Sequence, residues 1–111
     1  MKFTLTLIAA AAAAATALIA TGAHAADAKA AEALAKTSGC LACHTIDKKL
    51  VGPSYKEIAD RYRKDKSAAA NLAQKVKAGG KGVWGDIPMS PNAHVKDADI
   101  KTMVDWILSI K

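Results

Sequence analysis

The sequence has few cysteines and no pattern typical of β-strands. Its two cysteines, Cys40 and Cys43, are separated by two residues, and apolar and polar residues do not alternate along the chain. A structural zinc site would need two more soft ligands, and His94 is the only histidine after His44. A thioredoxin-like dithiol needs a βαβ setting, and a disulfide across so short a loop would add little stability. The cysteine pair therefore has another use.

That use is indicated by the residue after the second cysteine. Cys40-Leu41-Ala42-Cys43-His44 has the spacing C-x-x-C-H, the attachment sequence of a c-type haem. Two thiols at this spacing can add to the two vinyl groups of one porphyrin. The imidazole of the adjoining histidine then lies against the iron from one side. The motif predicts one covalently attached haem c.

Residues 1–25 predict a cleavable secretory signal peptide. Lys2 supplies a positive start, the stretch to Ala20 holds only apolar residues and threonines, and Ala23-His24-Ala25 has small residues where signal peptidase reads the chain. An uncleaved membrane anchor is the alternative, but seven consecutive alanines make the stretch weakly hydrophobic. We expect cleavage before Ala26, no stable membrane insertion, and a location in a bacterial periplasm, since haem of this kind is attached outside the cytoplasmic membrane.

The remaining residues, 26–111, predict one small all-α domain without repeats. A domain of this size buries a limited core, so a large apolar ligand such as a porphyrin would complete it. Apolar spacing and capping residues predict helices over 27–37, from a Ser54 cap to about Tyr62, from a Ser67 cap to about 78, and from an Asp97 cap to the C-terminus. Glycines and prolines predict a loop over 79–96.

The group on the other side of the iron decides between an electron carrier and an enzyme. Methionine is the usual second ligand in cytochromes c, because its soft thioether favours ferrous iron. Met89 lies between two prolines that stiffen its loop, whereas Met103 falls within the apolar stripe of the last predicted helix. We favour Met89 as the ligand and interpret Met103 as a core residue. His94 is the rival ligand, and an exposed loop histidine is the interpretation we favour for it.

Three further motifs make the resemblance specific. Leu50-Val51-Gly52-Pro53, Gly82-Val83-Trp84-Gly85 and Ile87-Pro88-Met89-Ser90-Pro91-Asn92 follow C-x-x-C-H in the order and spacing of the small bacterial class I cytochromes c of the cytochrome c-551 (c8) family. The chain resembles this family over nearly the whole of residues 26–111. The resemblance implies the class I cytochrome c fold, with four to five short helices around one covalent haem.

The resemblance also implies roles for single residues. Cys40 and Cys43 would form the thioether links, and His44 and Met89 would be the iron ligands. The remaining implied haem-binding residues are Pro53, whose carbonyl would orient His44, Asn92 near the Met89 sulfur, Trp84 at a haem propionate, and Lys75 where relatives often carry an arginine near a propionate. Lysine offers a point charge instead of a planar fork. Trp84 as plain packing and Asn92 as a turn residue stay open as alternatives.

The net charge of +6 suggests the kind of partner. Basic residues concentrate between Lys48 and Lys81, and most of them are expected on the solvated faces of short helices. The others would steer acidic redox proteins, such as a bc-type complex, nitrite reductase, terminal oxidase or peroxidase. Binding to nucleic acid is not expected, because the chain lacks an aromatic stacking platform. We expect a monomer.

Two functions remain open at this point. The first is a soluble periplasmic electron carrier, not an enzyme, in which both iron ligands stay in place. The second is a haem enzyme or ligand sensor, for example peroxidase-like, with a displaceable distal ligand. The sequence favours the carrier, since only His94 lies near Met89 as an acid-base group and no further domain exists to bind a substrate.

Overall fold

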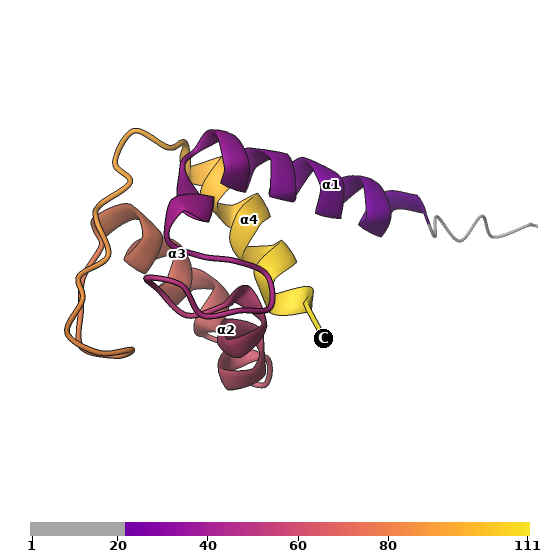
Figure 1. Ribbon diagram of the computed structural model, residues 1–111. Coiled ribbons are helices and arrows are strands. Elements are labelled where there is room, and N and C mark those ends of the chain that lie inside the picture. The colour runs from indigo at the N-terminus through magenta and orange to yellow at the C-terminus, as the bar shows by residue number, and fades with distance from the viewer. Residues whose placement is uncertain (1–21) are drawn as a thin grey trace, which may run out of the picture.

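Helices dominate residues 22–111, the part of the chain that the computed structural model describes (Figure 1). The elements are α1 (Gly22–Thr37), the short 3₁₀-helix η1 (Cys40–Ala42), α2 (Tyr55–Tyr62), α3 (Ala68–Ala78) and α4 (Asp97–Ser109). The predicted all-α class is confirmed. Most of the predicted signal peptide lies outside the described residues, so its cleavage remains a prediction. None of the helices in residues 22–111 is long and apolar enough to cross a membrane.

Helix α4 lies at the centre of the fold and packs against α1, α2 and α3. Its buried face carries Ile100, Met103, Val104 and Ile107. Opposite this face, α1 contributes fully buried alanines, which allow the two helix backbones to approach closely. Met103 is a core residue, as its position in the apolar stripe predicts.

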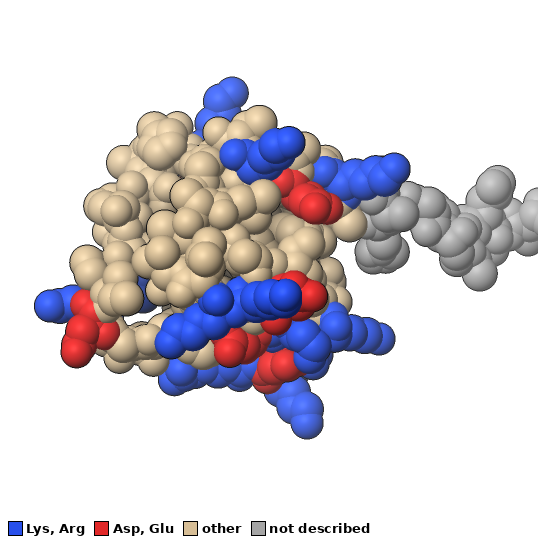
Figure 2. Space-filling view, viewed as in Figure 1, with Lys and Arg blue, Asp and Glu red and all other residues tan. Residues whose placement is uncertain are grey.

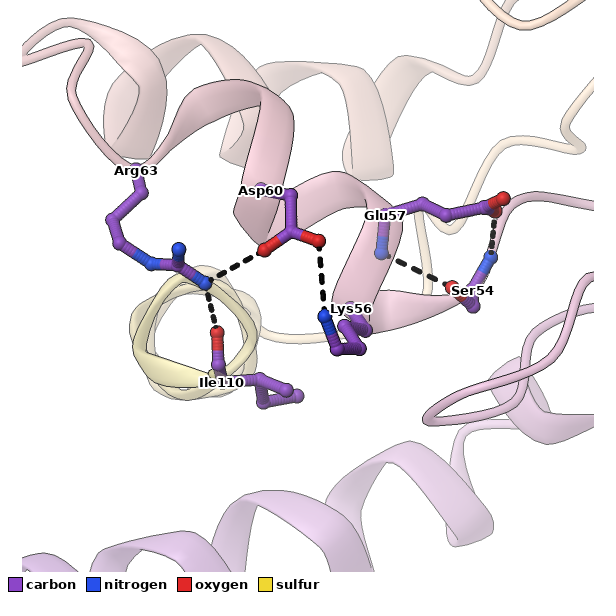
Figure 3. A network of polar contacts seen from close by, with 6 residues as sticks. All are labelled: Ser54, Lys56, Glu57, Asp60, Arg63 and Ile110. Atoms are coloured by element: carbon purple, nitrogen blue, oxygen red, sulfur yellow. Dashed lines mark hydrogen bonds and ion pairs between the residues drawn. The ribbon is translucent and has the colours of Figure 1, made fainter.

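The start of α2 is fixed by its cap. The Ser54 hydroxyl accepts a hydrogen bond from the Glu57 backbone N–H at 3.0 Å, and the Glu57 carboxylate accepts one from the Ser54 N–H at 2.9 Å (Figure 3). This reciprocal capping box satisfies two backbone donors that the first helical turn leaves free. The predicted cap at Ser54 is confirmed, and it places Pro53 directly before the helix.

Three predicted helix ends differ from the structure. Helix α1 begins five residues before Asp27. Ser67 precedes α3 without capping it, because its hydroxyl and its N–H both donate to Asp65, at 2.7 and 2.9 Å. Lys96 is the residue before α4, so Asp97 is the first helical residue and pairs at 3.0 Å with Lys77 of α3.

The segment 79–96 is the predicted loop, and it runs along one end of the molecule (Figure 1). Gly79 and Gly80 have φ of 71° and 141°, which turn the chain sharply out of α3. Their neighbourhood also holds an isolated antiparallel bridge between Gly80 and Met89. The loop therefore returns to its own beginning before it reaches α4.

Candidate functional site

A cavity of about 860 Å³ lies between the helices and the two long loops. Apolar side chains from α2, α3 and α4 line it, including Ile58, Leu72, Val76 and Ile107. Cys40, Cys43, His44, Pro53, Lys75, Trp84, Met89 and Asn92, the residues predicted to bind haem, all contribute to the lining. The fold thus brings together residues from five separate segments of the chain.

The two cysteines are presented by a tight turn that follows α1. Gly39 has a left-handed φ of 81°, and η1 then places the N–H groups of Cys43 and His44 on the Cys40 carbonyl at 3.1 and 3.0 Å. No disulfide joins the two cysteines; Cys40 is half-buried and Cys43 is exposed. Burial raises the pKa of the Cys40 thiol above its ordinary value. The sulfurs of Cys40 and Cys43 therefore line one cavity from a single short turn of the chain.

His44 is held in one orientation by a hydrogen bond to its ring and by a stacked aromatic ring. Its Nδ1 lies 2.7 Å from the carbonyl oxygen of Pro53. Because a carbonyl only accepts hydrogen bonds, Nδ1 carries the proton in this contact, and Nε2 of the neutral ring keeps its lone pair. The Tyr55 ring stacks on the imidazole, with ring centroids 5.4 Å apart and an angle of 22° between the planes. Nε2 is thus prepared to bind a metal.

The loop between His44 and α2 is tied down by backbone hydrogen bonds. The Gly52 N–H donates to the Cys43 carbonyl at 2.8 Å, and the Tyr55 N–H donates to the Thr45 carbonyl at 2.9 Å. A Cβ atom at position 52 would lie only 2.7 Å from Cε1 of His44. Glycine at this position is therefore required for the loop to pass so close to the imidazole.

Met89 is held by the bridge to Gly80. The Met89 N–H donates to the Gly80 carbonyl at 2.8 Å, and the Gly80 N–H donates to the Met89 carbonyl at 3.0 Å. At Gly79, a Cβ atom would lie 2.4 Å from the Met89 carbonyl oxygen. The thioether is half-buried in the cavity wall. The two glycines let the end of α3 approach the Met89 backbone closely enough to form this bridge.

Asn92 fastens the other end of the Met89 loop to α3. Its side-chain amide donates to the carbonyls of Val76 and Ser90, at 3.0 and 3.2 Å. Its backbone N–H donates to the carbonyls of Val76 and Lys77. Carbonyls in the last turn of a helix have no partner within the helix, so Asn92 satisfies them while it anchors the loop. His94, the rival iron ligand, is exposed two residues further on.

Lys75 and Trp84 lie at the rim of the cavity. The Lys75 ammonium approaches Gly80, where a Cβ atom would be 2.7 Å from Nζ. Trp84 is 40% exposed and meets Tyr62 edge to face, with centroids 6.4 Å apart. Both residues can offer a hydrogen-bond donor to an anionic group at the cavity mouth.

The residues present fit a covalently attached haem. The cavity offers two thiols, an imidazole nitrogen with a free lone pair and a thioether, and these are donors that suit haem iron. Its size and its mainly apolar wall are those of a site for a large flat ligand. Within residues 22–111, no three His, Cys, Asp or Glu side chains gather as a site for a bare metal ion.

Sequence reasoning missed several residues that shape this site. Gly52, Gly79 and Gly80 act through close backbone approaches, and only the folded chain shows which backbones meet. Tyr55 is the first residue of α2, and its stacking on His44 depends on the loop that precedes the helix. For the close approach of Gly52 to His44, the available signal in the sequence is the motif Leu50-Val51-Gly52-Pro53.

Comparison with known proteins gives a consistent result. The family model "Cytochrome c" matches residues 28–111. Cytochrome c-551 of Allochromatium vinosum is 53% identical over 77 residues, which are 69% of this chain and 82% of that protein. Cytochrome c-551 of Pseudomonas aeruginosa is 50% identical over 94 residues, 85% of this chain and 86% of the relative. The crystal structure of wild-type Nitrosomonas europaea cytochrome c552 superposes with a TM-score of 0.70 at 51% identity, over 72% of this chain and 99% of that one.

Proposed function

The chain belongs to the cytochrome c family, and we propose that Cys40 and Cys43 carry its haem while His44 and Met89 bind the iron. The protein is an electron carrier with one covalently bound haem c, and its relatives are electron-transfer proteins rather than enzymes. The class I cytochrome c fold predicted from the four motifs is confirmed.

The observation that supports this ligand set is that each ligand is held by the backbone of another segment. The Pro53 carbonyl orients His44, and the Gly80 bridge holds Met89. When bound, haem supplies the one-electron exchange between ferric and ferrous iron. Ligands that keep their positions in both oxidation states need little reorganisation, which suits rapid electron transfer better than binding of an exogenous ligand.

The rim residues would act on the anionic groups of the porphyrin. We infer that the Trp84 indole N–H and the Lys75 ammonium face the propionates, since both line the cavity mouth. Asn92 would act on the iron indirectly, because its amide fastens the loop that carries the thioether. Its closeness to the Met89 sulfur in the loaded protein remains part of the proposal.

The absorption spectrum of the ferric holoprotein tests the proposed ligands. Coordination by histidine and methionine predicts a low-spin spectrum with the far-red band that arises from charge transfer between methionine sulfur and iron. A protein with an open or displaceable distal side would lack this band and would bind cyanide or carbon monoxide quickly. A spectrum of that kind would favour the enzyme or sensor interpretation.

A carrier has redox partners, and we propose that these present acidic docking surfaces. Lysines and arginines, with a few acidic residues among them, gather along the edge of the molecule near α2, beside a largely uncharged face (Figure 2). Lys49 lines the cavity mouth beside the exposed Val51, and Ile87 is 66% exposed at the same mouth. Because electrons pass efficiently only over short distances, a partner would dock at this mouth, where basic and apolar residues meet. Partners of the four suggested kinds suit such a surface.

Electron exchange with an acidic partner is expected to slow as salt is added. Exposed charges are screened beyond about 8 Å at physiological ionic strength, so steering by Lys48 and Lys49 weakens as salt rises. The double variant Lys48→Glu, Lys49→Glu should lower the association rate about tenfold or more at low salt. The measurement is the bimolecular rate of reduction against ionic strength.

A matched control reverses two charges that do not line the cavity. Lys29→Glu with Lys111→Glu changes the net charge equally on exposed residues outside the cavity lining. It should leave most of the rate and of the salt dependence intact. If both double variants slowed exchange equally, net charge rather than a local docking surface would control association.

We further propose that the protein works in the periplasm. The support is the signal-peptide pattern of residues 1–25 together with haem attachment, which takes place outside the cytoplasmic membrane. The mass of the mature holoprotein from a periplasmic fraction tests this. A chain that starts at Ala26 and carries one haem is the expected product.

A further inference from the structure

Arg61 reaches from the last turn of α2 to the loop that borders the cavity. Its guanidinium carbon lies 4.7 Å from the centre of the Trp84 ring and 5.5 Å from the centre of the Tyr62 ring. Its Nη1 donates to the carbonyl of Val83 at 3.3 Å. Tyr62 and Trp84 also meet edge to face. One cation therefore contacts the face of the indole and the backbone residue just before it.

These contacts differ from those of an ordinary surface arginine. An exposed arginine usually keeps its head group in water, with contacts to residues nearby in the helix. Arg61 instead contacts a segment 22 residues further along the chain, through one hydrogen bond and one stacked ring. The planar guanidinium suits both contacts at once, because it stacks on aromatic faces and keeps its N–H groups free at the edge.

The contact also acts on the indole N–H. A cation over the ring face withdraws electron density from the indole, which makes its N–H a stronger donor to an anion. Loop residues 81–88 are exposed and hold two glycines with positive φ, Gly82 and Gly85, so the loop has little else to fix Trp84. Tyr62 supplies the apolar side of this contact and lines the cavity itself.

We propose that Arg61 is a positioning residue for the electron-transfer reaction: it holds Trp84 at the cavity mouth and strengthens the indole N–H as a donor to the haem propionate. The inference rests on the proposed function, in which Trp84 faces a propionate. It adds a residue outside the cavity lining to the groups that set the reduction potential. A positive charge held near the site favours the reduced state, so Arg61 also raises the potential.

Arg63, the residue directly after α2, provides a matched control. Its guanidinium donates to Asp60 at 3.1 Å and to the backbone carbonyl of Ile110 at the end of the chain (Figure 3). Removal of Arg63 therefore takes away the same charge two residues from Arg61, without a contact to the 79–96 loop. A general effect of lost charge near α2 would appear when either arginine is replaced. A positioning effect would appear only when Arg61 is replaced.

The experiment compares Arg61→Gln, Arg61→Lys and Arg63→Gln as reduced holoproteins. The chain has two tryptophans, so the indole N–H exchange of Trp84 can be followed by NMR with Trp106 as an internal reference. We expect Arg61→Gln to raise the exchange rate of Trp84 about two- to fivefold, as loss of an exposed cation–π contact implies. The reduction potential should fall in the same variant. Arg61→Lys should restore part of both, because the cation remains and the planar fork does not.

Two results would overturn the inference. One is an unchanged Trp84 exchange rate in Arg61→Gln, and the other is an equal change in Arg63→Gln. Before either result is interpreted, the low-spin spectrum with the methionine band is recorded on each sample to show that the proposed iron ligands are in place. If the parent protein lacks that band, the proposed iron ligands fail and the Arg61 inference fails with them. If the band is present and Trp84 is indifferent to Arg61, only the inference fails.

Discussion

Replacing both Cys40 and Cys43 with alanine is expected to leave a chain without stable tertiary structure. The reason is the small protein core. Several of its buried members are alanines, at positions 31, 35, 59 and 68, and the larger buried side chains come mostly from α4. Met103, Val104 and Ile107 of that helix also line the cavity. The core and the wall of the cavity are therefore formed by the same residues.

Without haem, water reaches a cavity of about 860 Å³ whose wall is mainly apolar. Each 100 Å² of apolar wall left in contact with water costs about 2.5 kcal/mol. Small domains have a total stability of about 5–15 kcal/mol, so even a part of this loss removes the folded state. Attached haem fills the cavity, so we expect the chain to fold stably only when haem is bound.

Circular dichroism and thermal unfolding of the double variant test this expectation. The single variant Cys43→Ala is the matched control, because one thioether link from Cys40 keeps the porphyrin tethered. The control should unfold cooperatively at a reduced temperature, and the double variant should show no cooperative transition. A haem-free double variant that melts cooperatively near the temperature of the holoprotein would show that the polypeptide alone completes the core.

Met89→Ala should change the spin state and the reduction potential of the iron. Without the thioether, the ferric protein becomes high-spin or takes His94 or a lysine as its new ligand. Loss of the soft sulfur disfavours ferrous iron, so the potential should fall by on the order of 0.1 V or more, within the range of about 0.8 V that axial ligands span. Electronic spectra and a redox titration measure both changes.

Met103→Leu is the control for this variant. It removes the other methionine of residues 26–111, and leucine is close in volume, so the expected loss of stability is below about 1.5 kcal/mol. Spin state and potential should stay near those of the parent protein. If Met89→Ala kept a low-spin spectrum with the methionine band, Met89 would not be the ligand.

The helices could be predicted from the sequence to different degrees. The start of α2 is predicted by Ser54, a residue type that favours helix caps. The structure adds the Glu57 half of the capping box, which lies only three residues away. Ser67 resembles such a cap in sequence, but Asp65 binds its hydroxyl first. Asp97 likewise pairs with Lys77, which lies 20 residues earlier on another helix. The cap that meets no competing partner was predicted correctly, and the two whose side chains bind another residue were not.

The residues of the site also differ in how far the sequence predicts them. The haem-binding roles of Cys40, Cys43 and His44 could be predicted, because the C-x-x-C-H spacing is by itself typical of haem attachment. The bridge from Gly80 to Met89 gives no periodic signal, because it consists of two hydrogen bonds rather than a strand. Arg61 resembles every other basic residue in this stretch, and only the folded loop shows that it lies over Trp84.

The most direct measurement of the central proposal is the NMR spectrum of the reduced holoprotein labelled in its methionine methyl groups. The ring current of the porphyrin strongly shields a methyl group held over the iron. We expect one strongly upfield-shifted methyl signal that remains in Met103→Leu and is absent from Met89→Ala. A shifted signal that is lost with Met103, or a parent protein without any shifted methionine methyl, would contradict iron binding by Met89.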